Sequence, residues 1–231
     1  MMLTGTIVNA IGVILGGSVG LLIHRLLHKG IPQRFSDRIM QGIGLATIYI
    51  ALGGLLGGSN AMITILSMVS GAVLGEWLDL DGKVSRLSQR LEAKFSNDGN
   101  GNFAQGFMSA TLLFCVGTMA ILGSLDSGLR GDHATLYAKS VMDTISACIF
   151  ASTLGAGVLF SAAAIVIYQG SITLLASLIG PYLTETVIAE MNVVGSLLLL
   201  GLSLDLLGIK HLKLMNYIPA MFMPILFCLF M

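Results

Sequence analysis

Residues 3–23 read LTGTIVNAIGVILGGSVGLLI, an uncharged run that is long enough to cross the apolar part of a bilayer as one helix. The first basic residues, His24 and Arg25, follow this run, so we expect a membrane span and not a cleaved signal peptide. Small residues recur every four positions along it, and this spacing lets another backbone approach closely. The stretch predicts helices packed together in a membrane; the small residues are Gly12, Gly16 and Gly20.

The composition of the whole chain agrees with this prediction. Of the 231 residues, 55% are hydrophobic and 10% are charged, whereas about 25% of residues are charged in a typical soluble domain. The formal net charge is zero, so nothing in the composition indicates a nucleic-acid partner. We expect an all-α polytopic protein whose main partner is the lipid bilayer.

About eight segments have the length and apolar character of a membrane helix. The short stretch 155–159, GAGVL, joins the fifth to the sixth, so these two could form one long bent element. We treat residues 1–231 as one transmembrane domain with a cytoplasmic helix and linker at about 80–102. The eight predicted spans are Leu3–Ile23, Ile39–Leu56, Ala61–Leu78, Phe103–Gly123, Ala138–Gly157, Leu159–Ile179, Val187–Leu207 and Leu214–Met231.

The positive charges predict an orientation for these spans. Ten of the twelve Lys and Arg residues follow spans one, three and seven, and cytoplasmic loops of membrane proteins collect such residues. Only Arg130 and Lys139 fall on the other side. We therefore expect a multi-pass membrane protein with both termini outside the cytoplasm. The ten are Arg25, Lys29, Arg34, Arg38, Lys83, Arg86, Arg90, Lys94, Lys210 and Lys213.

One cytoplasmic segment has an amphipathic pattern. Within Lys83–Phe95, apolar residues share one helical stripe opposite the cations, which predicts a helix lying on the membrane surface. A partner-docking helix is the alternative. The residues Asn97–Asn102, NDGNGN, predict a flexible linker before span four.

A second row of small residues lies in span three, where Ser67, Gly71 and Gly75 repeat the four-residue spacing of span one. Such a row forms a groove for a neighbouring helix. Static packing within one chain, a sliding interface and a homo-oligomer seam all fit this pattern.

Spans two and five resemble each other weakly. Aligned without gaps, Ile39–Gly53 and Val141–Gly155 share four of fifteen residues and place Gln41 opposite Asp143. Because these two spans run in opposite directions, spans one to three and four to six are predicted to form an inverted repeat. Transporters often have this architecture, with the binding site where the repeats meet.

Asp143 is the clearest charged residue within a predicted span, and Lys139 precedes it by one helical turn. Charges at membrane depth are costly, so they usually face protein or water and often mark function. One interpretation is an ion or proton site or a ligand contact. The other is a local ion pair that extends to the outer interface.

Further polar residues extend this candidate pathway. Asn9 and Asn192 lie toward the outer ends of spans one and seven, where amides either bond neighbouring helices or contact a solute. The segment Gly123–Asp132 carries Asp126 and Arg130, and it predicts either an outer vestibule or an ordinary solvated loop. The complete candidate set is Asp143, Lys139, Gln41, Asn9, Asn192, Asp126 and Arg130.

No pattern of residues predicts an enzyme. The three cysteines form no CxxC pair, and His24 and His28 lack a carboxylate that would complete a zinc site. We expect these two histidines to contact lipid headgroups. The sequence predicts no catalytic residue, no metal and no cofactor.

Several strings together resemble those of an uncharacterised bacterial family. They cover nearly the whole chain, and they are similar to those of the YdfK/YqgA-like integral membrane proteins of bacteria. The resemblance implies an inner-membrane location and several spans, and it transfers no binding residue. The strings begin at residues 9, 75, 114, 136, 192 and 216 and read NAIGVILGGSVGLL, GEWLDL, FCVGTMAILGSLDSGLRGD, LYAKSVMDTISACIFASTLGAGV, NVVGSLLLLGLSLDLLGIK and NYIPAM.

The function that these features favour is transport or export of a small solute or ion. The glycine-rich helices, the predicted repeat and Asp143 all point in this direction. A passive channel assembled as an oligomer is one alternative. A structural or regulatory membrane protein without transport activity is the other.

Overall fold

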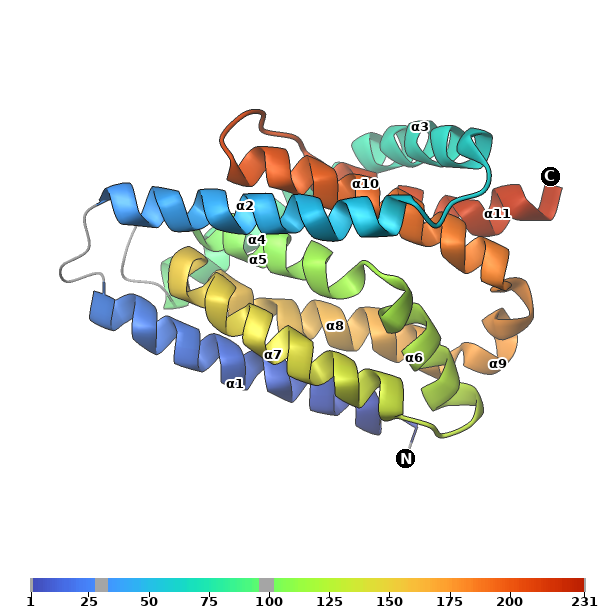
Figure 1. Cartoon of the computed structure of the whole chain (residues 1–231), viewed down its shortest axis with the longest axis horizontal. Coiled ribbons are helices and arrows are strands. Elements are labelled where there is room, and N and C mark those ends of the chain that lie inside the picture. Colours follow the sequence, from blue (N-terminus) through green and yellow to red (C-terminus); the bar gives the residue numbers. More distant parts are fainter. Residues whose placement is uncertain (1, 28–32, 96–101, 231) are drawn as a thin grey trace. The chain divides into compact units, whose positions relative to one another are not determined.

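A computed structural model describes residues 2–27, 33–95 and 102–230, and these residues form helices without any strand (Figure 1). Lys29 and most of the predicted linker Asn97–Asn102 lie outside the described residues. The elements are α1 (Thr4–Leu27), α2 (Gln33–Leu55), α3 (Ala61–Leu78), α4 (Leu80–Phe95), α5 (Asn102–Cys115), α6 (Thr118–Leu129), α7 (Ala134–Leu154), α8 (Gly157–Leu174), α9 (Ala176–Ile179), η1 (Gly180–Tyr182), α10 (Glu185–Leu206), η2 (Leu214–Phe222) and α11 (Met223–Phe230).

The prediction of an all-α protein with apolar spans is confirmed. In the described part of the chain, the four helices α1, α3, α8 and α10 are long and apolar enough to cross a membrane. The bent pair α5 and α6 would be a fifth if it counts as one span. Residues 40–55 of α2 and residues 214–230 are shorter apolar segments.

The helices divide into two compact units, and neither is continuous in sequence. Unit 1 contains Met1–Ser36, Arg86–Cys115 and Met119–Gly180. Unit 2 contains the remaining segments, Asp37–Ser85, Val116–Thr118 and Pro181–Met231. The predicted repeat does not follow this division, because span one belongs to unit 1 and spans two and three to unit 2. The inverted repeat therefore stays a prediction.

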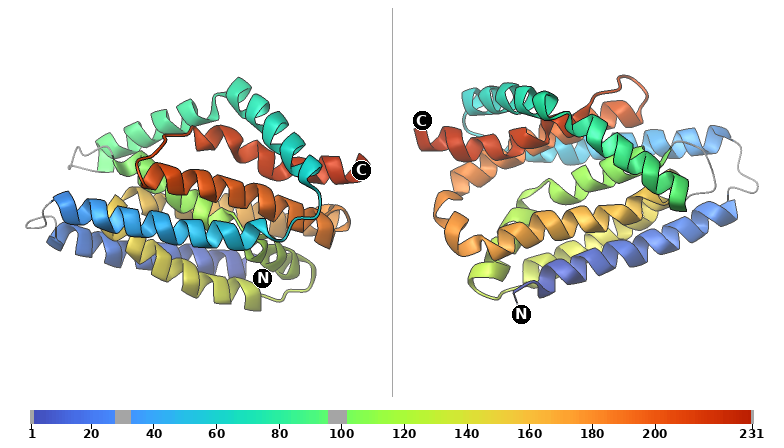
Figure 2. Two further views of the ribbon diagram at one scale, coloured as in Figure 1. Left: turned by 45° about the horizontal axis from the view of Figure 1, so that its top comes forward. Right: turned by 180° about the vertical axis from the view of Figure 1, so that it is seen from behind.

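Unit 1 is built around α1 and α7, which lie side by side and run in the same direction (Figure 2). A Cβ atom at Gly16 would collide with the carbonyl group of Thr144, and one at Gly20 would collide with that of Cys148. The row of glycines predicted to allow close approach is thus occupied by the backbone of α7. Because α7 of the same chain covers the glycine face of α1, this face does not form a seam between copies of the protein.

The helices α7 and α8 form an antiparallel hairpin, so the predicted fifth and sixth spans are separate elements. α7 ends at Gly155, which has a φ of 76°, a left-handed backbone conformation that residues other than glycine rarely adopt. A Cβ at Gly157, the first residue of α8, would collide with the carbonyl of Phe103, so α5 packs closely against α8 there.

The predicted fourth span, Phe103–Gly123, is not one straight helix. α5 ends at Cys115 and α6 begins at Thr118, and the two helix axes differ by 61°. Gly117, with a φ of 120°, lies at the break. Kinks in helices have local causes, and a glycine in this conformation interrupts the helical hydrogen bonding.

Unit 2 is held together by a second set of close approaches. α3 runs antiparallel to η2, with Gly71 against Ala220 and Gly75 against the carbonyl of Asn216. α2 runs antiparallel to α10, since Gly44 meets Leu207 and Gly58 meets Val193. The small-residue row of α3 therefore serves packing within the chain.

The last predicted span, Leu214–Met231, is only partly α-helical. Its first part, η2, is a 3₁₀-helix that contains Pro219, a residue without a backbone N–H. The α-helical part, α11, begins at Met223, and Pro224 lies in its first turn, where a missing N–H removes no helical bond.

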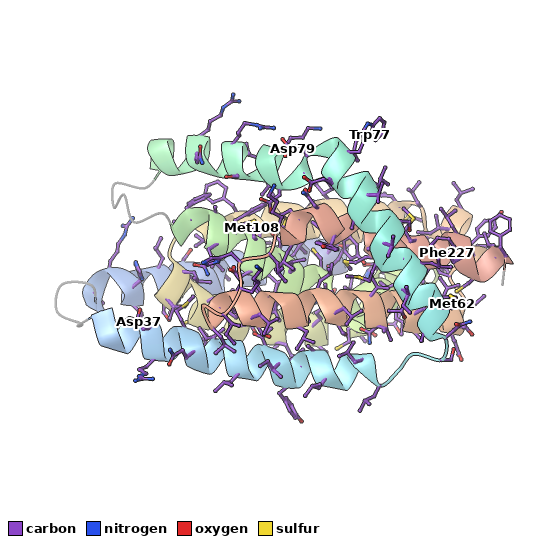
Figure 3. All side chains as sticks on the ribbon, turned by 90° about the horizontal axis from the view of Figure 1, so that it is seen from above. Asp37, Met62, Trp77, Asp79, Met108 and Phe227 are labelled. Atoms are coloured by element: carbon purple, nitrogen blue, oxygen red, sulfur yellow. The ribbon has the colours of Figure 1, made fainter. Side chains whose placement is uncertain are left out.

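The predicted surface helix Lys83–Phe95 is present as α4, which begins three residues earlier at Leu80. Asp79, with a φ of 47°, separates it from α3. Trp77, at the end of α3, points away from the neighbouring helices and is 81% exposed (Figure 3). Exposed tryptophan is typical of the interface between membrane and water.

Candidate functional site

A buried ion pair on α7 is the centre of the candidate site. The Nζ atom of Lys139 lies 2.9 Å from Oδ1 and 2.8 Å from Oδ2 of Asp143, one helical turn later. Each residue is 6% exposed. The second interpretation of the sequence, a pair that extends to the interface, does not describe this geometry, because both charged groups lie inside unit 1.

Two amide side chains from other helices complete a network with this pair. Asn9 Nδ2 on α1 donates to Asp143 Oδ2 at 3.0 Å and to Gln169 Oε1 on α8 at 3.4 Å. Neither amide residue has any exposed surface. The network therefore links three helices of unit 1 at one point.

The glycines of α1 explain how Asn9 reaches the carboxylate. Gly12 lies about one turn after Asn9, and the atoms nearest to it belong to Ser140 and Thr144. Thr144 Oγ1 donates to the carbonyl of Ser140 at 2.6 Å, so its hydroxyl is satisfied within α7. Because the two backbones are so close, the short side chain of Asn9 spans the gap between them.

The helix before the break packs against the helix that carries these charges. α5 contacts both α7 and α8, and its last residue, Cys115, is buried. The carbonyl end of α5 carries a partial negative charge that adds to the electrostatics of this region.

The other predicted pathway residues have different partners. Asp126 and Arg130 form a pair at 3.4 Å, with side-chain exposures of 34% and 77%, near the end of α6. Most of the predicted vestibule or loop Gly123–Asp132 is thus helical, since α6 continues to Leu129. Asp126 and Arg130 are partly or largely exposed, as the solvated interpretation expected of them, whereas Ser124 and Ser127 are buried.

Gln41 and Asn192 belong to unit 2. Gln41 Oε1 accepts from Arg38 Nη1 at 2.9 Å on the exposed part of α2. Asn192 Nδ2 donates to the carbonyl of Gly54 at 3.3 Å, which joins α10 to the end of α2. Asn192 therefore bonds neighbouring helices, one of the two roles expected for it.

A buried carboxylate that the sequence analysis missed lies in α10. Glu190 has no exposed surface. Its Oε1 accepts from the backbone N–H groups of Ser59 at 2.7 Å and Asn60 at 2.9 Å, and from Ser59 Oγ at 3.2 Å. Oε2 accepts from Thr64 Oγ1 at 3.3 Å. A carboxylate near the N-terminus of α3 is favoured by the helix dipole.

We expect Glu190→Gln to destabilise the folded protein by about 1–2 kcal/mol, because bonds to a charged acceptor become bonds to a neutral one. The matched control is Glu185→Gln, an exposed position in the first turn of the same helix. Unfolding in detergent micelles measures both variants. Equal stability of the two would show that the carboxylate charge of Glu190 is not needed to hold residues 59–64.

The acidic residues at the junction of α3 and α4 are also hydrogen-bonded. Asn216 Nδ2 donates to Glu76 Oε2 at 2.6 Å, and the N–H of Asp81 donates to Asn216 Oδ1 at 2.7 Å. Partial burial raises the pKa of the Asp81 carboxyl, and the Lys213 ammonium partly offsets this effect. Asn216 therefore fixes η2 against the turn that joins the two helices.

His24 does not have the predicted headgroup-facing position. It is 8% exposed, and its Nδ1 lies 2.9 Å from the carbonyl oxygen of Ser152 near the end of α7. His28 lies outside the described residues. Among the residues that the structure describes, no three His, Cys, Asp or Glu side chains are grouped as a metal site would require.

Comparisons with known proteins agree with the membrane character of these helices. The family model described as "Protein of unknown function (DUF554)" matches residues 4–229. The "Uncharacterized membrane protein YdfK" of Bacillus subtilis (strain 168) is 31% identical over 224 residues, which cover 95% of this chain and 93% of that protein.

The "Uncharacterized protein YqgA" of Escherichia coli (strain K12) is also 31% identical over 224 residues, which cover 95% of this chain and 94% of that protein. No solved structure matches the chain. The family resemblance seen in the sequence is confirmed, and the protein is a helical membrane protein that belongs to the DUF554 family.

Proposed function

We propose that this protein is a secondary transporter or exporter of a small solute or ion, and that Asn9, Lys139 and Asp143 form part of its site. The buried ion pair carries the proposal. Taking two charges out of water costs several kcal/mol for each ion, and hydrophobic residues of similar volume often replace such a pair without loss of stability. A pair retained inside an apolar helix unit is therefore better explained by function than by folding.

The break between α5 and α6 supports the same function. Discontinuous helices in transporters place their free carbonyl and N–H groups at the binding site, near the middle of the membrane. Cys115, the last residue of α5 before the break, is buried. α5 packs against α7, the helix that carries the charged pair, and both belong to unit 1.

Eight membrane crossings fit the directions of the helices within each unit. If the chain crosses eight times, α1 and α7 are the first and fifth crossings and run in parallel, and α8, the sixth, is antiparallel to α7. In unit 2, α2 is antiparallel to α10 and α3 is antiparallel to η2. Each of these relations agrees with strict alternation of eight crossings.

The proposed location is the bacterial inner membrane, with both termini on the outer side. The distribution of Lys and Arg supports this orientation, since ten of twelve fall on the opposite side. The predicted inverted repeat is not required, because the site proposed here is formed by helices of unit 1 alone.

The test is transport by the purified protein in liposomes. Amino acids, organic anions, polyamines and inorganic ions are offered under sodium and proton gradients, and capacitive currents and tracer uptake are recorded. We expect a saturable signal that Asp143→Asn abolishes and Asp126→Asn leaves unchanged. The control removes the same charge from an exposed i,i+4 pair of the same unit.

Other outcomes point to the other functions. A conductance that rises linearly with concentration and does not saturate would indicate a passive channel. Absence of any flux from folded wild-type protein, or equal flux from Asp143→Asn and the wild type, would contradict the proposed site. Absence of flux from folded wild-type protein would favour a structural or regulatory membrane protein.

A further inference from the structure

The two amides of the buried network are joined by only one of the two hydrogen bonds that a pair of amides can form. Asn9 Nδ2 donates to Gln169 Oε1 at 3.4 Å, which is long for a hydrogen bond. Within the described part of the chain, Asn9 Oδ1 and Gln169 Nε2 have no partner, although neither residue has any exposed surface. Buried polar atoms normally have a partner, so this open acceptor and open donor require an explanation.

The charge of Asp143 decides which atom of each amide is left open. A carboxylate only accepts hydrogen bonds, so it must receive the NH₂ group of Asn9, which lies at 3.0 Å. The same NH₂ group faces Gln169, so that amide must turn its carbonyl oxygen toward Asn9. Turning either amide over would break this chain of bonds. The open atoms are therefore a carbonyl oxygen on α1 and an NH₂ group on α8.

The two open atoms lie close together because they belong to amides in contact. The oxygen and nitrogen of one amide group are about 2.2 Å apart, so the 3.4 Å contact places Asn9 Oδ1 and Gln169 Nε2 at most about 8 Å from each other. A third carboxamide group, with hydrogen bonds of ordinary length at its oxygen and its nitrogen, reaches partners up to about 8 Å apart. One such group is therefore long enough to bridge the two atoms.

The charges beside these atoms favour a ligand without net charge. Lys139 and Asp143 already neutralise each other at 2.8 Å inside unit 1. A ligand with a net charge would lose its hydration there without gaining an opposite charge from this pair. The ligand must also offer an acceptor to Gln169 Nε2 and a donor to Asn9 Oδ1. A carboxamide offers both with its own oxygen and NH₂ group.

We propose that Asn9 and Gln169 bind a small neutral carboxamide, which accepts a hydrogen bond from Gln169 Nε2 and donates one to Asn9 Oδ1. Lys139 and Asp143 stay paired and orient the two amides. Gln169 is thereby added to the residues of the proposed site. This inference rests on the proposed function, because it names the class of solute that the same site takes.

The test is binding of three molecules of the same shape to the purified full-length protein in detergent, measured by saturation-transfer NMR. Acetamide carries both hydrogen-bonding groups, acetone has a methyl group in place of the NH₂ group, and acetate has a negative charge and no donor. A ligand this small binds no more tightly than roughly 0.04 mM, so a method for weak binding is required. We expect saturable binding of acetamide. Acetone and acetate are expected to bind at least about 10-fold more weakly, because each leaves Asn9 Oδ1 unpaired.

Two variants show whether the open donor takes part. Gln169→Met keeps the length of the side chain and removes its hydrogen-bonding groups, so acetamide binding is expected to weaken by about 10-fold or more. The matched control is Ser161→Ala, which removes a buried hydroxyl of the same helix that donates to the carbonyl of Val158 at 2.6 Å. This variant is expected to bind acetamide like the wild type. If Gln169→Met does not fold, the comparison of acetamide with acetone on the wild type still decides.

The outcomes separate this inference from the proposed function. If the wild type does not bind acetamide, or binds acetone equally well, the inference is wrong even when liposomes show Asp143-dependent transport of another solute. Equal acetamide binding by folded Gln169→Met and the wild type also overturns it. Acetamide flux is followed by osmotic swelling of liposomes, because a neutral solute carries no current. If acetamide binds as expected and liposomes show no flux of acetamide or of any other solute, the site stands and the transport function fails.

Discussion

Replacing Asp143 with alanine is expected to destabilise the folded protein by about 3–5 kcal/mol, the typical cost of breaking a buried ion pair. The substitution leaves the Lys139 ammonium inside unit 1, where that residue is 6% exposed. It also removes the acceptor of the Asn9 amide, which donates to Asp143 at 3.0 Å. Reversible unfolding in mixed micelles, followed by circular dichroism, measures the change.

A compensating double variant separates stability from function. Lys139→Met combined with Asp143→Leu removes both charges and keeps similar volumes, so we expect stability to return to near the wild-type value while transport stays abolished. Asp126→Ala, which breaks an exposed pair, is expected to change stability by no more than about 0.5 kcal/mol. A double variant as unstable as Asp143→Ala would mean that the pair is retained for folding.

The second large effect is expected at the seam between α1 and α7. A side chain at Gly16 would meet backbone atoms of Thr144, with the carbonyl carbon at 2.8 Å from the new Cβ. Backbone cannot rotate away as a flexible side chain can, so Gly16→Val is expected to destabilise by about 3 kcal/mol or more. The free energy of unfolding is again the measurement.

The matched control for this seam is Gly53→Ala in α2, where no heavy atom lies within 4 Å of the added Cβ. Alanine has the higher helix propensity, so this variant is expected to be neutral or to gain up to about 1 kcal/mol. If Gly16→Val were tolerated as well as Gly53→Ala, α1 and α7 would not be packed backbone to backbone.

The positions of the helices could largely be predicted, because an apolar run of about 20 residues has few alternatives in a membrane. The break at Gly117 could not, since glycine is common inside membrane helices and only its backbone angle distinguishes this one. The 3₁₀ geometry of η2 could not be predicted from the sequence either. Pro219 predicts a disturbance of the helix there and does not specify its form.

The candidate site was predictable where it depends on spacing and not where it depends on packing. Lys139 and Asp143 are four residues apart on one helix, so their contact follows from helical geometry. The approach of Asn9 requires knowing which helix occupies the glycine face of α1, and the sequence does not give the partner. Glu190 was overlooked because a single acidic residue near the start of a span resembles a solvated one.

The division of unit 1 along the chain has a consequence for biosynthesis. α1 ends at Leu27, and α7, which covers its glycine face, begins only at Ala134. At the usual rate of translation of about 5–20 residues per second, α7 emerges roughly 5–20 s after α1 is complete. During that interval the amide of Asn9 has neither Asp143 nor Gln169 to bond. α1 is therefore inserted in the membrane before its packing partner has been made. If translation stalls before residue 134, α1 keeps an amide without its native hydrogen bonds, and such chains are expected substrates of quality-control proteases.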